Sequence, residues 1–459
     1  MTYLQAVAYL ESLANYEQIH DAEAIRSVRL SRMRHLCQRL GDPQRWFRSI
    51  LVAGTNGKGS LCAMLYAMLR ESSLRVGLYT SPHLEHLRER IRVGGGGEGT
   101  EERTFGDDWI EKSQVAALVE QLQPAVEALR KTPDGPPTHF EALTALALLS
   151  FQRRRVDVAV LEVGLGGRLD ATNIVDQAIS LIGPIDVDHA DILGATPVAI
   201  AKEKAGIIKP HQTVITVPQS AEVLEILRAA CEAQGVELLV CGEAFTVDVQ
   251  RHGLTGLHIS LGGLRGRYDA VHVPLLGRHQ AQHAAVAVAA MEVLSSTGIP
   301  HSMVERGFSK LEWPGRLEIV HESPTILMDG AHNPHAARAL AETLQELWGD
   351  RRMHFLVGMS ADKPVEAIGE ILGRMSISIT CTQSRHPRAL DPNILAKRLS
   401  AYGPVGHVFN DAADAYTYLL NTTAPSDMIV VTGSLFFVGE LRWALRRAHV
   451  RTRRKTVAA

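Results

Sequence analysis

The stretch SILVAGTNGKGS at residues 49–60 decides the fold class of this chain. Its apolar run, 50–53, predicts a buried strand, and helical spacing over 61–69 predicts a helix directly after the glycine-rich loop. Glycines let backbone N–H groups converge on phosphate oxygens, and the helix N-terminus adds partial positive charge. Lys58 can reach the outer phosphates and the Ser60 hydroxyl can ligate magnesium. The stretch predicts a triphosphate site, although its spacing is shorter than GxxxxGK[ST]; the alternative is a glycine-rich turn without function.

Strands and helices alternate on either side of this unit. Further strands are expected at 76–80, 156–163, 178–183 and 212–217, with helices at 138–152, 197–207, 221–234 and 279–296. After residue 313 the pattern restarts, with strands at 325–328, 354–357, 377–380, 408–409 and 428–432. Such alternation predicts mostly parallel sheets covered on both faces. We expect an α/β protein with a larger domain at 1–312 and a smaller α/β domain at 313–459.

Three segments depart from this alternation. Residues 236–275 alternate apolar and polar side chains and contain several glycines, which predicts short antiparallel strands. The polar, glycine-rich stretch 94–108 is interpreted as a surface loop. The basic tail 446–459 is interpreted as a solvated helix end, rather than a contact with a polyanion.

Composition excludes several classes of protein. The 459 residues carry 48 Lys and Arg against 50 Asp and Glu, so bulk charge indicates no nucleic-acid binding. Five cysteines without a CxxC pair suggest free thiols in a reducing compartment. The chain has no signal-peptide pattern and no run of the about 18 apolar residues that a membrane span needs. We therefore expect a cytoplasmic protein that binds neither nucleic acid nor membranes.

Acidic side chains at strand ends suggest a metal site. In LEVGLGGRLDATN, at 161–173, Glu162 ends an apolar strand, where open α/β sheets commonly bind ligands. A buried acid needs a partner, which a metal ion would supply; alternatively, Glu162 is a structural acid. The glycines here lack the GxGxxG spacing of a dinucleotide site.

Three more segments carry candidate residues. In IDVDHADILGATPVAIAKEKAGIIKP, at 185–210, His189 is either a magnesium ligand or a structural histidine, and Lys204 lies on a predicted helix where lysines ordinarily face solvent. Arg316 of WPGRLE and Asp329 of LMDGAHNP would contact nucleotide if the second domain closed over the first. Otherwise both are ordinary surface charges.

These motifs together resemble one family. GTNGKGS, YTSPHLEHLRERIRV, THFEALT, LEVGLGGRLDATN, DHADILGATPVAIAKEKAGIIKP, WPGRLE, DGAHNP and VTGSLFFVGE occur in order between about residue 20 and residue 445. The set is similar to the folylpolyglutamate synthase and dihydrofolate synthase family of the Mur ligase superfamily. The resemblance implies a larger P-loop-type ATP-binding domain and a smaller Rossmann-like domain. It also implies an ATP-dependent ligase in which L-glutamate attacks an acyl phosphate of dihydropteroate or a reduced folate, releasing ADP and phosphate.

The resemblance also implies roles for individual residues, and we expect a monomer that uses two Mg²⁺ ions. The ATP site would contain Thr55, Asn56, Gly57, Lys58, Gly59, Ser60, His283, Arg316 and Asp329. The metal ligands would be Ser60, Ser81, Glu162, His189 and Lys204, the last carbamoylated by carbon dioxide. The catalytic set would be Lys58, Lys204, Glu162 and His189, and the folate site would contain Arg29, Leu30, Thr138, His139, Phe140, Glu141, Leu169, Asp170 and Ala171.

The chain departs from the family pattern in two places. His283 of HQAQHA replaces the asparagine of the family's HQxxNA, and an imidazole cannot form an amide's paired hydrogen bonds. SVRLSRM at 27–33 has Val28 and Arg29 where the family often has a leucine-glycine step. Two alternatives to a folate ligase stay open: a Mur-type ligase acting on muramyl peptides, and a nucleotide-binding protein with a decayed site.

Overall fold

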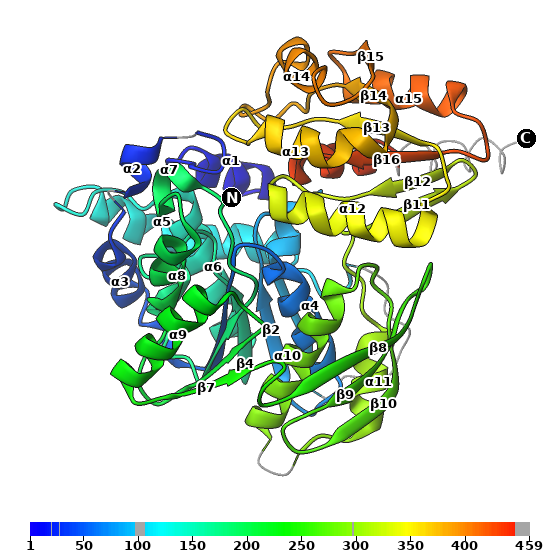
Figure 1. Cartoon of the computed structure of the whole chain (residues 1–459). Helices are drawn as coiled ribbons and strands as arrows, with labels where there is room; N and C mark the ends of the chain where they lie inside the picture. Colours follow the sequence, from blue (N-terminus) through cyan, green and yellow to red (C-terminus); the bar gives the residue numbers. More distant parts are fainter. Residues whose placement is uncertain (20, 27, 97–105, 296–297, 446–459) are drawn as a thin grey trace, which may run out of the picture.

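The computed structural model describes residues 1–19, 21–26, 28–96, 106–295 and 298–445, and it contains three β-sheets (Figure 1). The largest sheet has the strand order β3-β2-β4-β1-β5-β6-β7. Its neighbouring strands are parallel except β2 and β3, which are antiparallel. The strands are β1 (Arg48–Ala53), β2 (Arg75–Tyr79), β3 (Ile91–Gly95), β4 (Val158–Glu162), β5 (Ile179–Ile182), β6 (Thr213–Thr216) and β7 (Glu237–Val240).

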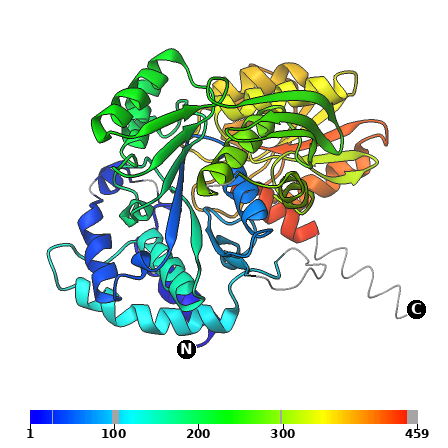
Figure 2. The same ribbon diagram turned by 90° about the horizontal axis from the view of Figure 1, so that it is seen from below.

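Helices cover both faces of this sheet, so its strands are apolar along their length (Figures 1 and 2). Successive side chains of β1 enter opposite layers: Ile50 and Val52 pack in one core, and Leu51 and Ala53 in the other. The first core contains α4 (Lys58–Leu69), α10 (His279–Leu294) and α11 (His301–Ser309). The second contains α1 (Tyr3–Glu11), α3 (Leu30–Arg39), α5 (Lys112–Leu129), α6 (His139–Arg153), α8 (Pro197–Ala205) and α9 (Ala221–Gln234).

The segment 236–275 contains the expected antiparallel strands, with one correction. The strands β8 (Thr246–Gly253), β9 (Gly256–Gly262) and β10 (Arg267–Val273) form a three-stranded antiparallel sheet that packs against α10 and α11. The first strand of the segment, β7, instead pairs in parallel with β6 at the edge of the large sheet. It follows α9 directly, so it completes a strand-helix-strand unit.

The second domain is built on a six-stranded sheet of order β11-β12-β16-β13-β14-β15, in which only β11 is antiparallel to its neighbour. It lies above the large sheet in Figure 1. Its strands are β11 (Glu318–Glu322), β12 (Thr325–Met328), β13 (Met353–Val357), β14 (Ser376–Cys381), β15 (Val405–Val408) and β16 (Met428–Thr432). Its helices include α12 (Pro334–Trp348), α13 (Val365–Leu372), α14 (Pro392–Leu399) and α15 (Ala412–Thr422).

The expected loop at 94–108 is wrong at its start, because Gly94 and Gly95 belong to β3. A Cβ atom on Gly94 would lie 2.9 Å from the Tyr66 hydroxyl, so glycine lets the neighbouring helix α4 approach the strand. Residues 97–105 of that loop and the basic tail 446–459 lie outside the described residues. The five cysteines are free, as expected, and all five are buried. In the described part of the chain, no helix is both long and apolar enough to cross a membrane.

Candidate active site

A cavity of about 670 Å³ lies where the carboxyl ends of the two parallel sheets face one another. From the first domain it is lined by residues that follow β1, β2, β4 and β5, which are adjacent in the large sheet. From the second domain it is lined by residues that follow β12, β13 and β16. Ligands of open α/β sheets bind at such edges, so the position of the cavity marks it as the candidate site.

The glycine-rich loop forms one wall of this cavity. Gly57 precedes α4 with a φ of 74°, a conformation that favours glycine, and Lys58 is the first residue of the helix. The Lys58 ammonium donates hydrogen bonds to the carbonyl oxygens of Gly54 and Thr55, at 3.0 and 3.3 Å. The Lys58 ammonium and the N-terminus of α4 therefore lie at the same loop, and together they favour the binding of a phosphate group.

Glu162 ends β4 as expected, and its side chain is only 5% exposed. Its Oε2 atom accepts a hydrogen bond of 3.0 Å from the backbone N–H of Ser81, which joins two predicted metal ligands. Burial raises the pKa of the Glu162 carboxyl, although Lys58 and the Ser81 N–H oppose the rise. A buried carboxyl that costs free energy to ionise would be stabilised by a bound cation.

Lys204 does not face solvent, so the ordinary expectation for a helical lysine is wrong here. It is 4% exposed, and its ammonium donates a 2.8 Å hydrogen bond to the Gly54 carbonyl oxygen of the phosphate loop. Burial, assisted by the charge of Lys58, lowers the pKa of Lys204 to about 7. The amine is therefore partly neutral, and nucleophilic, near physiological pH.

His189 lies on the same cavity wall, after β5, and has a φ of 50°. Burial, together with the charge of Lys363, lowers the pKa of His189 to about 3, so its imidazole is neutral and could act as a metal ligand. No group of three or more His, Cys, Asp and Glu in the described part of the chain forms a metal cluster. The predicted ligand set also contains serines and a modified lysine, which are not among these four residue types.

Arg316 and Asp329 also line the cavity, from the second domain. The Asp329 carboxylate accepts hydrogen bonds from the backbone N–H groups of Leu317 and Ala331, at 2.9 and 2.8 Å. Burial raises the pKa of the Asp329 carboxyl, and the charge of Arg316 opposes that rise. Asp329 thus fixes the chain just before β11 and just after β12, which supports Arg316 at the cavity.

His283, the departure from the family pattern, packs directly against the phosphate loop. Its Nδ1 atom is 3.1 Å from the Gln280 Oε1 atom, which can only accept, so the hydrogen is on Nδ1. A Cβ atom on Gly57 would lie 2.3 Å from the Nε2 atom of His283. Nε2 is buried without a hydrogen-bond partner among the described residues. The imidazole therefore supports Gly57 by close contact.

Six of the nine predicted folate residues line the other end of the cavity. Thr138 caps α6 in a capping box with Glu141, which also pairs with Arg32 at 2.8 Å. Asp170 accepts hydrogen bonds from three backbone N–H groups and the Thr172 hydroxyl, so it holds its own loop together. Thr138, Phe140, Glu141, Leu169, Asp170 and Ala171 all line the cavity.

Three predicted folate residues lie outside the lining. Arg29 is exposed before α3, Leu30 packs in the core, and His139 is buried beneath the cavity wall. The apolar part of the lining instead includes Ile25 and Val28, which the sequence did not single out as contacts. Helix termini and their side-chain directions decide which neighbours face a cavity, and motif spacing does not specify them.

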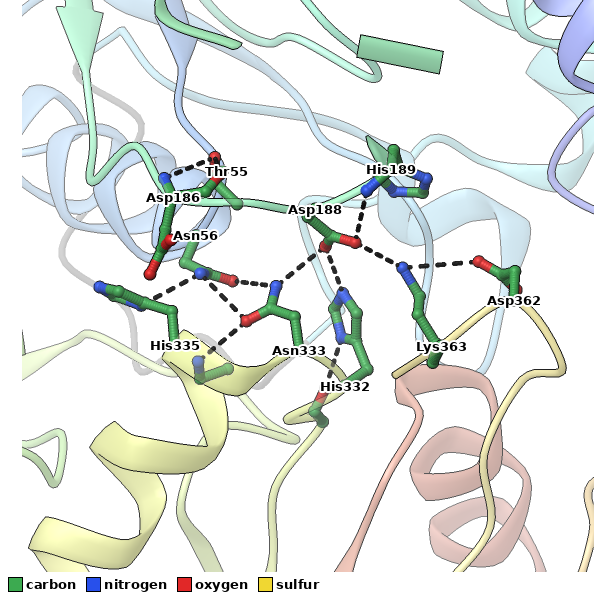
Figure 3. Close-up of polar contacts among 12 residues, drawn as sticks. Thr55, Asn56, Asp186, Asp188, His189, His332, Asn333, His335, Asp362 and Lys363 are labelled. Atoms are coloured by element: carbon green, nitrogen blue, oxygen red, sulfur yellow. Dashed lines mark hydrogen bonds and ion pairs between the residues drawn. The ribbon is translucent and has the colours of Figure 1, made fainter. Parts of the chain in front are cut away.

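The sequence also missed a polar network across the domain boundary (Figure 3). The Asn56 amide of the phosphate loop donates to the Asn333 Oδ1 atom at 3.3 Å and accepts from Asn333 at 3.0 Å. Asp188 contacts Asn333 at 2.9 Å and the Lys363 ammonium at 2.8 Å. Burial opposes ionisation of Asp188, but contacts with His332 and Lys363 hold the pKa of its carboxyl well below its usual range. The two domains therefore meet through hydrogen bonds at the cavity.

Comparison with known proteins identifies the family of this chain. Residues 111–291 match the Mur ligase middle domain and residues 315–435 match the Mur ligase glutamate ligase domain. The dihydrofolate synthase/folylpolyglutamate synthase of Bacillus subtilis is 35% identical over 423 residues, which cover 91% of this chain and 95% of the relative.

Solved structures agree with this similarity. A Mycobacterium tuberculosis folylpolyglutamate synthase complexed with ADP and AMPPCP superposes with a TM-score of 0.86 and 33% identity, covering 96% of this chain and 98% of that one. An Escherichia coli relative in complex with DHPP and ADP gives a TM-score of 0.83 and 29% identity, covering 98% of this chain and 99% of that one. The chain belongs to the folylpolyglutamate synthase/dihydrofolate synthase family of Mur ligases.

Proposed function

We propose that this protein is an ATP-dependent ligase that joins L-glutamate to the carboxylate of dihydropteroate, of a folyl-glutamate, or of both. One observation carries the proposal: a single cavity combines a phosphate loop at one end with an apolar wall at the other. Family membership favours this activity over a muramyl-peptide ligase or a decayed nucleotide-binding protein. We further propose 1–312 and 313–459 as its domains, a monomeric state, and action in the cytoplasm.

The polar end of the cavity suits phosphoryl transfer. The Lys58 ammonium donates to neutral carbonyl oxygens of its own loop, and it could exchange them for the anionic oxygens of a triphosphate, which are stronger acceptors. Thr55, Asn56, Gly57, Gly59 and Ser60 would hold the phosphates with it, and His283 would support Gly57. Arg316 would add positive charge from the second domain. Positioning and charge neutralisation supply most of the catalysis in such reactions.

The same wall could hold magnesium. Ser60, Ser81, Glu162 and His189 would be ligands, and Glu162 fits because a cation would offset the cost of its buried charge. Magnesium, when bound, would neutralise the transferring phosphoryl group and orient it. Hard oxygen ligands fit this ion better than the imidazole does.

Lys204 would complete the ligand set after modification. An ammonium cannot bind a cation, but a neutral amine can attack carbon dioxide and lose one proton, which gives a carbamate whose single negative charge is shared by two oxygens. The low pKa of about 7, caused first by burial, supplies the neutral amine for this step. Lys204 lies beside the phosphate loop, so its carbamate would lie beside the phosphates.

The apolar end of the cavity would bind the folate-type acceptor. Phe140, Leu169 and Ala171 would contact its ring system, with Thr138 and Glu141 at the start of α6. Closure of the two domains around the site would exclude water from the acyl phosphate, which would otherwise hydrolyse before L-glutamate attacks. The hydrogen bonds between Asn56 and Asn333 join the two domains at the cavity, which supports such a closure.

Phosphate release tests the proposal. With ATP and magnesium present, phosphate should appear only when both a pteroate-type acceptor and L-glutamate are added. Each substrate should be omitted in turn. D-glutamate in place of L-glutamate serves as a matched control, because it carries the same amine with the opposite configuration. Release without either substrate, or no release with both, would overturn the proposal.

A further inference from the structure

Several side chains of the second domain meet at the carboxylate of Asp188, which belongs to the first domain (Figure 3). Its Oδ1 atom accepts a 2.8 Å hydrogen bond from the Lys363 ammonium, and its Oδ2 atom accepts one of 2.9 Å from the Asn333 amide. The side chains of Asp188 and Lys363 are 9% and 7% exposed. Lys363 follows β13 and Asn333 precedes α12, so one buried carboxylate fixes two separate elements of the second domain.

Asp188 is itself fixed to the first domain. Its Oδ1 atom also accepts a 2.8 Å hydrogen bond from the backbone N–H of His189, which sets the orientation of the carboxylate. Two residues earlier, the backbone of Asp186 exchanges hydrogen bonds of 3.1 and 2.8 Å with the Thr55 hydroxyl of the phosphate loop. The position of Asp188 therefore follows the position of that loop.

Lys363 connects this contact to a second one across the boundary. Its ammonium lies 3.7 Å from the carboxylate of Asp362, which pairs with Arg388 at 2.6 Å. Arg388 in turn donates a hydrogen bond of 3.3 Å to the backbone oxygen of Glu17 in the first domain. Lys363, Arg388 and Glu17 all line the cavity. A displacement of Lys363 would thus affect its own contact with Asp188 and, through Asp362, the contact of Arg388 with Glu17.

We propose that Asp188 is a positioning residue: it holds the domains closed and places the Lys363 ammonium in the cavity. Removing one partner of a buried ion pair leaves the other charge unpaired, which opens a polar interface. The kinetic part of this proposal rests on the proposed ligase function, whereas the closure part does not. Asp188 acts through Lys363 and Asn333, and need not contact a substrate.

The kinetics of Asp188→Ala, measured in the otherwise unchanged chain and in a Lys363→Ala chain, test whether Asp188 acts through Lys363. In the otherwise unchanged chain, kcat should fall by at least about 10-fold while the KM for ATP changes less than about 2-fold, because misplaced groups slow the reaction without weakening the phosphate loop. In a Lys363→Ala chain, the same substitution should lower kcat by a smaller factor, because only the contact of Asp188 with Asn333 remains to be lost. Asp188→Asn keeps the shape of the side chain and should show an intermediate loss. An equal loss in both backgrounds would overturn the proposal.

A distance measurement tests closure independently of activity. All five native cysteines are buried, so dyes can be attached to Glu225→Cys on α9 and Lys397→Cys on α14, both exposed positions. Energy transfer between the dyes should change in Asp188→Ala. It should not change in Arg338→Ala, a matched control that removes the exposed pair with Asp186, where Arg338 is 51% exposed.

The two readouts separate the two proposals. Unchanged energy transfer in Asp188→Ala would overturn the positioning role, even if the unmodified protein is an active ligase. Absence of glutamate-dependent phosphate release from the unmodified protein, with transfer that still depends on Asp188, would overturn the ligase function and leave the closure role intact.

Discussion

Gly57→Ala should damage the phosphate loop through two separable effects. The residue has a φ of 74°, and an alanine there costs about 1 kcal/mol because its side chain crowds the backbone. The new Cβ atom would also lie 2.3 Å from the Nε2 atom and 2.4 Å from the Cε1 atom of His283. The ring must then rotate and lose its hydrogen bond to Gln280, which adds about 1–3 kcal/mol with the lost packing. We expect a total loss of about 2–4 kcal/mol in the free energy of unfolding.

Urea unfolding and ATP titration calorimetry would measure both consequences. In a His283→Ala background the steric part disappears, so Gly57→Ala should cost only about 1 kcal/mol. Gly41→Ala is the matched control, because Gly41 has a φ of 79° and nothing within 4 Å of a Cβ atom. ATP affinity should fall by at least about 10-fold in Gly57→Ala and stay unchanged in Gly41→Ala. Equal costs in both backgrounds, or a cost no larger than that of Gly41→Ala, would refute the reasoning.

Three further predictions concern buried polar groups. Lys204→Ala should lose most ligase activity and regain part of it with a short carboxylic acid, measured as initial rate; full activity without the acid would exclude the carbamate. Because burial raises the pKa of Glu162, folded protein retains its proton to higher pH, so the free energy of unfolding should fall as pH rises above 4.5. Glu162→Gln should lack this decline in urea titrations without ligand, and an identical decline would contradict the assignment. Asp170→Ala should cost about 2–4 kcal/mol by leaving buried N–H groups unpaired, whereas Arg168→Ala, which removes an exposed pair, should cost less than about 1 kcal/mol; similar costs would count against the loop-holding role.

The sequence predicted the alternating framework because buried parallel strands and helices differ in their apolar periodicity. It placed Glu162 and Asp329 at strand ends, and parallel strands bring such ends together at one edge. It missed α5, which contains Pro124 in its interior, and β11, which has only five residues and a glutamate at each end. It also assigned β7 to the antiparallel segment, since pairing partners are not encoded in a single strand.

The local sequence pattern could not predict which charged side chains are buried or how the two domains contact each other. Lys204 resembles any helical lysine in sequence, and only packing against the phosphate loop removes it from solvent. Asp188 and Lys363 are 175 residues apart, and each is an ordinary charged residue in its own motif. Their contact depends on how two domains pack, which local spacing does not determine.

The mass of the reaction product tests the central claim most directly. The protein would be incubated with ATP, magnesium, L-glutamate and either dihydropteroate or tetrahydrofolate, offered separately, and the products analysed by mass spectrometry. We expect at least one acceptor to gain the mass of one glutamyl residue, with one ADP formed for each residue added. Unchanged masses for both acceptors, under conditions in which the protein binds ATP, would contradict the proposal.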